Sequence, residues 1–78
     1  MSKEKRKKVR EYIKTTGIKA GHVYKHAENG KLYRILGIGL EPISLTPKVI
    51  YTEVNDIEWQ DIYTEDLESL KDKLIINN

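Results

Sequence analysis

Apolar positions are sparse at the start of the chain and follow one narrow stripe of helical spacing. The stripe consists of Val9, Tyr12 and Ile13. Good helix formers surround it, Ser2 offers a capping side chain, and Gly17 stands where helices commonly end. The pattern predicts a helix over residues 2–16, and only its second half carries enough apolar surface to pack on a core.

From residue 18 onwards the pattern changes to short runs of β-branched and aromatic residues separated by turn signals. The predicted strands are residues 22–27, 31–38, 48–54 and 57–63. Asn29-Gly30 predicts a hairpin between the first two, because this pair readily adopts the positive φ angles of a tight turn. Gly37 and Gly39 predict a bulge or bend at the end of the second strand. The two prolines predict a loop over 40–47.

The end of the chain predicts a second, short helix. Thr64 fits an N-cap, and Glu65 and Asp66 would follow in the first turn, where the helix dipole favours acidic groups. Its apolar face would consist of Leu67, Leu70 and Leu74. Residues 75–76 fit either a fifth strand or a continuation of this helix.

Length and composition leave room for one small domain. The chain has 78 residues, of which 38% are hydrophobic and 33% charged, which is too apolar for a disordered chain and too polar for a membrane protein. Short antiparallel strands in this number cannot form two packed sheets. We therefore expect a mainly β fold, namely a small, SH3-like, partly open antiparallel barrel of four to five strands with an N-terminal helix and a short C-terminal helix. We divide the chain into a basic helix at 1–17 and an SH3-like β domain at 18–78.

Cysteine is absent, which excludes disulfides and thiolate metal sites. The charged N-terminus lacks the apolar stretch of a signal peptide, and no segment is apolar enough to cross a membrane. We expect a cytoplasmic protein with no membrane partner.

Charge is divided unevenly along the chain. The net charge is +2, but residues 1–14 hold seven basic and two acidic groups, a local charge of +5, and the remaining seven basic and ten acidic groups give −3. A basic arm attracts nucleic acid, because lysine and arginine release the counterions of phosphates. A merely solvated helix face is the alternative. The candidate nucleic-acid contacts are Lys3, Lys5, Arg6, Lys7, Lys8, Arg10, Lys14, Arg34 and Lys48.

Four segments of the chain resemble the motifs of a family of small bacterial and phage domains of unknown function. The segments are GHVYKH at 21–26, NGKLYRILG at 29–37, VIY at 49–51 and Trp59. The family pattern is G-x-x-Y-x-H, a glycine turn, Y-x-V-x-G, V-x-Y and a later tryptophan. The resemblance covers about residues 18–67 and implies an SH3-like fold with no established activity. Gln60 and Asp61 depart from the pattern, which has Arg-Pro after the tryptophan.

The aromatic residues are five tyrosines and one tryptophan, with no phenylalanine. Tyrosine and tryptophan combine an apolar ring with a polar end, and both are enriched at binding surfaces. The candidate partner-binding residues are Tyr24, His26, Tyr33, Tyr51 and Trp59. Packing of these rings in a thin core is the alternative. For His26 we also expect a hydrogen bond to the backbone of the hairpin.

Catalysis and metal binding find no support in the sequence. His22 and His26 lie roughly 13 Å apart along a strand, too far to share one metal. No serine lies in a nucleophile elbow, and no glycine-rich phosphate loop is complete. We therefore expect neither an enzyme nor a cofactor.

The function that we favour from the sequence is a non-catalytic binding module, most simply a protein-interaction or regulatory adaptor with an aromatic groove. The alternative is a nucleic-acid-binding protein whose basic N-terminal helix contacts phosphates. A homodimer through exposed strand edges is a further expectation.

Overall fold

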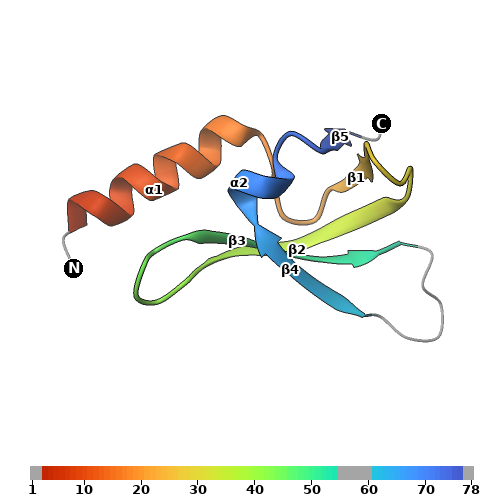
Figure 1. Ribbon diagram of the computed structural model, residues 1–78. Helices are drawn as coiled ribbons and strands as arrows, with labels where there is room; N and C mark the ends of the chain where they lie inside the picture. The colour runs from red at the N-terminus through yellow and green to blue at the C-terminus, as the bar shows by residue number, and fades with distance from the viewer. Residues whose placement is uncertain (1–2, 55–60, 77–78) are drawn as a thin grey trace.

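The computed structural model describes residues 3–54 and 61–76 and is mainly β (Figure 1). Its elements in chain order are α1 (Lys3–Thr16), β1 (Val23–His26), β2 (Leu32–Leu40), β3 (Pro47–Glu53), β4 (Ile62–Asp66), α2 (Leu67–Leu70) and β5 (Leu74–Ile76). The described strands form one antiparallel sheet in the order β4-β3-β2-β1-β5. The sheet is therefore open, with β4 and β5 as its two edges.

The first helix and the first three strands confirm the predictions, with strand ends within two residues of those expected. Gly17 ends α1 with a φ of 74°, in the left-handed region that glycine adopts without a steric penalty. The predicted hairpin is also present. Gly30 has a φ of 73° and its N–H donates to the carbonyl of His26 at 2.9 Å. Local turn chemistry thus determines where both elements end.

A bulge bends strand β2 near its middle. Ile35 pairs with Tyr51 of β3 whereas Gly37 pairs with Ile50, so Leu36 is an extra residue in the ladder. A bulge is present as predicted, but β2 continues to Leu40, so the bulge lies within the strand and not at its end. Because of the extra residue, Ile38 pairs with Val49 and joins the same sheet face as Ile35.

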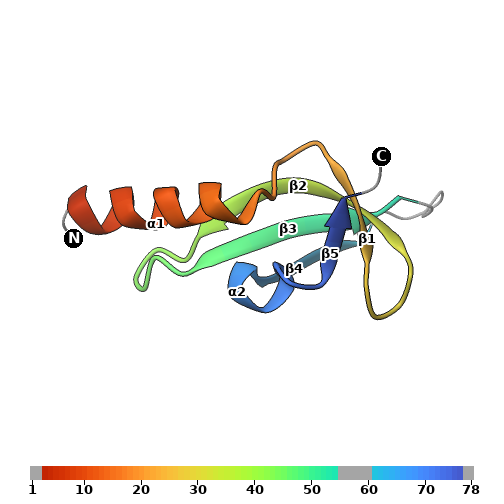
Figure 2. The ribbon, with the colours of Figure 1, turned by 90° about the horizontal axis from the view of Figure 1, so that it is seen from above.

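The two helices lie on one side of the sheet (Figures 1 and 2). The buried core between them and the sheet consists of Ile18, Tyr24, Ile35, Val49, Leu67 and Leu70. Tyr12 and Ile13 pack against this core from the last turns of α1, as the narrow apolar stripe predicted. The opposite side of the sheet carries no described helix.

The predicted boundary between a fourth strand over 57–63 and a helix beginning at Thr64 is wrong, and residues 57–60 of that predicted strand lie outside the described residues. Thr64 lies in β4 and pairs with Ile50, and α2 begins only at Leu67 and has four residues. Continuing the strand through Asp66 adds ladder hydrogen bonds to β3, which a helix beginning at Thr64 would forgo. Leu74 accordingly lies in β5, and residues 75–76 belong to that fifth strand, not to a longer helix.

Candidate functional site

Helix α1 projects from the body of the molecule. Its 14 residues give a rod about 21 Å long, and none of them is buried. In both ribbon views the first turns extend past the end of the sheet and its β2–β3 loop (Figures 1 and 2). Most of the helix surface is therefore available to a partner.

Five cationic side chains follow one side of α1, and we call them the basic stripe. They are Lys3, Arg6, Lys7, Arg10 and Lys14. Intervals of three and four residues place them above one another on a helix, and the first four line a shallow surface hollow. Glu4 and Glu11 border the stripe, but none of the ion pairs found in residues 3–54 and 61–76 includes a stripe residue. The positive charge of the stripe is thus not neutralised within the described structure.

A polar cluster anchors the last turns of α1 to α2. The hydroxyl of Tyr12 donates a hydrogen bond to the carboxylate of Glu68. Lys71 Nζ lies 5.4 Å from the centre of the Tyr12 ring and 3.5 Å from Glu68 Oε1. The hydrogen bond from Tyr12 lowers the pKa of Glu68 below its ordinary range, and the same bond raises the pKa of Tyr12.

This anchor sets the orientation of the basic stripe. Arg10 and Lys14 each lie two residues from Tyr12, which is about 200° around a helix. Since Tyr12 points at α2, the stripe lies on the side of α1 away from its anchor. The cations are therefore held outward.

Two of the aromatic candidates lie in the interior of the molecule. Tyr24 is 4% exposed, and its hydroxyl donates to the carbonyl of Gly17 at 3.2 Å and accepts from the N–H of Lys19 at 3.0 Å. Tyr33 is 8% exposed, and its hydroxyl accepts from Asn29 Nδ2 at 3.0 Å. Both rings supply core packing, so the thin-core alternative holds for them and an open groove lined by them is absent from the described surface.

The remaining rings form a row that runs from the interior to the surface. Tyr33 meets Tyr51 edge-on at 5.2 Å between ring centres, and Tyr51 lies 5.6 Å from Tyr63. Tyr51 is partly buried, which raises the pKa of its phenol, and Tyr63 on edge strand β4 is 41% exposed. Tyr63 was not among the sequence candidates, because its place beside Tyr51 depends on the β3–β4 register.

His26 has the backbone role that was predicted for it. Its Nδ1 accepts a hydrogen bond from the N–H of Glu28 at 3.1 Å in the hairpin connection. The ring also meets Tyr33 edge-on at 6.1 Å. Trp59, the remaining aromatic candidate, lies outside the described residues.

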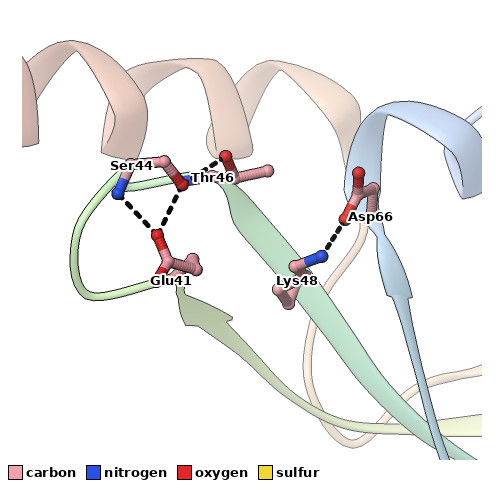
Figure 3. Close-up of polar contacts among 5 residues, drawn as sticks. All are labelled: Glu41, Ser44, Thr46, Lys48 and Asp66. Atoms are coloured by element: carbon pink, nitrogen blue, oxygen red, sulfur yellow. Dashed lines mark hydrogen bonds and ion pairs between the residues drawn. The ribbon is translucent and has the colours of Figure 1, made fainter.

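The two strand cations proposed as nucleic-acid contacts lie apart from the aromatic rings. Arg34 follows Tyr33 and Lys48 precedes Val49, and successive residues of a strand point to opposite faces. Both cations therefore lie on the sheet face away from the helices, and Lys48 is paired with Asp66 (Figure 3). The described structure therefore does not bring these two cations and the aromatic rings onto one face of the sheet.

The β2–β3 loop, residues 41–46, is held together by hydrogen bonds among its own residues (Figure 3). The carboxylate of Glu41 accepts hydrogen bonds from the backbone N–H groups of Ile43 and Ser44 and from the Ser44 hydroxyl at 2.7 Å. These bonds, that of the hydroxyl first, lower the pKa of Glu41. Leu45 has a φ of 59° yet is buried, so the loop holds a side chain inward from a backbone conformation that leucine rarely adopts. The loop geometry is thus tightly determined.

Other kinds of site gain no support from the described part of the chain. Nowhere in it do three histidine or acidic side chains converge in a way that could hold a metal. Its helices are too short and too polar to cross a bilayer.

Comparison with known proteins gives no match: no family model, no curated protein and no solved structure resembles this chain. The resemblance to the small bacterial and phage family stays a prediction from the sequence motifs.

Proposed function

We propose that this protein is a small, non-catalytic module that binds nucleic acid through the basic stripe of α1. One observation carries the proposal. Five cations lie along one side of an exposed helix, outside the ion pairs of the described structure and directed away from its anchor. A phosphate backbone requires such a row of cations and little else, because counterion release supplies most of the non-specific affinity.

The chemistry of α1 favours nucleic acid over the other polyanions. A helix that lies on a membrane needs a free apolar face, but Tyr12 and Ile13 already pack against the core. Protein interfaces gain most of their affinity from aromatic and apolar anchors, and the stripe contains none. What the stripe offers is charge at regular intervals.

A protein partner is the second candidate function, and edge strand β4 favours it. Ile62 is 64% exposed and Tyr63 is exposed beside it, on a strand whose outer side pairs with no described strand. An extended peptide or a second copy of the chain could add to such an edge. This surface would replace the aromatic groove of the sequence-based hypothesis.

We also propose that the sheet is an SH3-like, partly open barrel. Two features support this assignment: the fifth strand returns to pair with β1, and the bulge in β2 bends the sheet. In an SH3-like module α1 would be an appendage to the β domain, which agrees with a division near residue 17.

A triple variant tests the proposed function. Replacing Lys3, Lys7 and Arg10 by glutamine removes three stripe charges. Its control replaces two lysines and one arginine elsewhere, namely Lys19, Lys25 and Arg34, so both variants have the same net charge. Fluorescence anisotropy of a labelled DNA in about 100 mM salt should show at least about tenfold weaker binding for the stripe variant and a change within about twofold for the control.

Circular dichroism of both variants establishes that they fold. Equal losses in the two variants would show that overall charge, not the stripe, attracts the DNA. Failure of the unaltered protein to bind in low salt would refute the proposal.

A further inference from the structure

We infer that the nucleic acid bound by α1 is duplex DNA, with the helix lying along the major groove and the basic stripe contacting phosphates. This inference rests on the proposed function and makes it specific. Three features of the described residues carry it: the shape of α1, its lack of stacking groups, and the surroundings of Tyr51 and Tyr63.

The shape of α1 fits a groove. From Lys3 to Lys14 the stripe runs about 16 Å along a straight axis, and a helix with its side chains is about 10–12 Å wide. The major groove of B-form DNA is about 12 Å wide and admits one helix, whereas that of duplex RNA is too narrow. Because the first turns of α1 extend past the sheet, they can approach DNA without a collision between the DNA and the sheet (Figure 2).

A single-stranded ligand would need stacking groups that α1 does not offer. Proteins that bind single strands combine cations with exposed aromatic rings on which bases stack. The aromatic residue of α1 is Tyr12, which is engaged by Glu68 and Lys71 on the side away from the stripe. The stripe therefore reaches phosphates without reaching bases.

Tyr63, the exposed ring of the row, and its partly buried neighbour Tyr51 are unsuitable for a single strand because each has a carboxylate beside it. Glu65 lies two residues from Tyr63 and Glu53 two residues from Tyr51, so the alternation of a strand places each acid on the same face as its ring. Burial is the main cause of the raised pKa of Tyr51, and the nearby charge of Glu65 adds to it. A phosphate next to Tyr63 would be repelled by Glu65, whereas Glu53 is paired with Lys31 at 4.0 Å.

The stripe also predicts weak sequence preference. Its members are lysine and arginine, and contacts of such cations to phosphates position a protein without identifying bases. Helix α1 contains neither asparagine nor glutamine, the side chains that most specifically recognise adenine. We expect DNA of different sequences to bind alike.

Anisotropy titrations of the full chain test the inference. The probes are a labelled DNA duplex of about 20 base pairs, its single strand and the duplex RNA of the same sequence, each between about 50 and 200 mM salt. The duplex DNA should bind about tenfold or more tightly than either of the others, with a slope of log K against log salt near −4.5 for five phosphate contacts. Lys7→Gln should reduce that slope by about 0.9.

The outcomes separate the two proposals. Equal or tighter binding of single-stranded DNA, or of duplex RNA, would overturn the duplex DNA inference and leave nucleic-acid binding intact. Absence of binding to all three probes in low salt would overturn both. Tyr63→Ala should leave the affinity for all three probes unchanged. A selective loss of single-strand binding in this variant would show that bases stack on the sheet and would overturn the inference.

Discussion

Of the helices in the described residues, the longer one, α1, contributes less buried surface to the core than the shorter one, α2. Helix α1 has 14 residues and buries none, whereas α2 has four residues and buries Leu67 and Leu70 completely. A single helical turn is unstable by itself, so α2 exists because its leucines complete the core. The longer helix contributes Tyr12 and Ile13 to the edge of that core and displays the rest of its surface.

Helix α1 also contains repulsion between like charges on neighbouring turns, which α2 does not. Lys3 and Lys7, Arg6 and Arg10, and Arg10 and Lys14 are like-charged neighbours four residues apart. Each such pair destabilises a helix by about 0.2–0.5 kcal/mol. These three pairs offset the favourable pairs Glu4–Lys8 and Lys7–Glu11 of the same helix, and a bound polyanion would relieve their repulsion.

The largest expected effect comes from breaking α2. Leu67→Ala removes a fully buried side chain and should lower the free energy of unfolding by about 2–5 kcal/mol, measured by urea denaturation. The control is Val9→Ala, which shortens a partly exposed side chain of the apolar stripe of α1 and should cost less than about 1 kcal/mol. Equal costs would mean that α1 is as much a part of the core as α2.

A smaller effect should follow from releasing α1 from α2. Tyr12→Phe removes the hydrogen bond to Glu68 and retains the ring, so the amide protons in the last turn of α1 should exchange faster with solvent. The pKa of Glu68 should rise towards its ordinary value, because Tyr12 is the main cause of its depression. Tyr63→Phe is the matched control, and unchanged exchange in the Tyr12 variant would show that Ile13 alone holds the helix.

The smallest expected effect is the pH dependence of stability that comes from Glu41, which lies in the β2–β3 loop and in neither helix. The pKa of Glu41 in the folded protein lies below the ordinary value of about 4.5, so its stabilising contribution is present above that pH and is lost as the pH falls through the lower, folded value. Ser44→Ala removes the largest cause and should raise the pKa of Glu41 in an NMR titration. Ser69→Ala should leave it unchanged; a shift of the same size there would contradict the assignment.

Local patterns were sufficient to predict α1 and the first three strands, because caps, turns and alternation are properties of neighbouring residues. The start of α2 could not be predicted in this way. Thr64 has a good capping side chain, but its pairing with Ile50 depends on a register set fourteen residues earlier.

The candidate site, too, could be predicted from local patterns only in part. Alternation already implied that Tyr33 and Arg34 lie on opposite faces, so their separation was predictable from the sequence. The burial of Tyr24 was not, because it depends on which face the helices cover. The outward direction of the basic stripe depends on the contact of Tyr12 with Glu68, which joins residues 56 positions apart.

The separation of charge in this fold has a consequence for the rate of association. One end of a molecule 41 Å long carries the basic stripe, while the chain after residue 14 has a net charge of −3. In the field of a polyanion such a molecule experiences a torque that turns α1 towards the DNA before contact. A larger share of collisions then begins with the correct end, so association should be fast in dilute salt and should slow as salt screens the field.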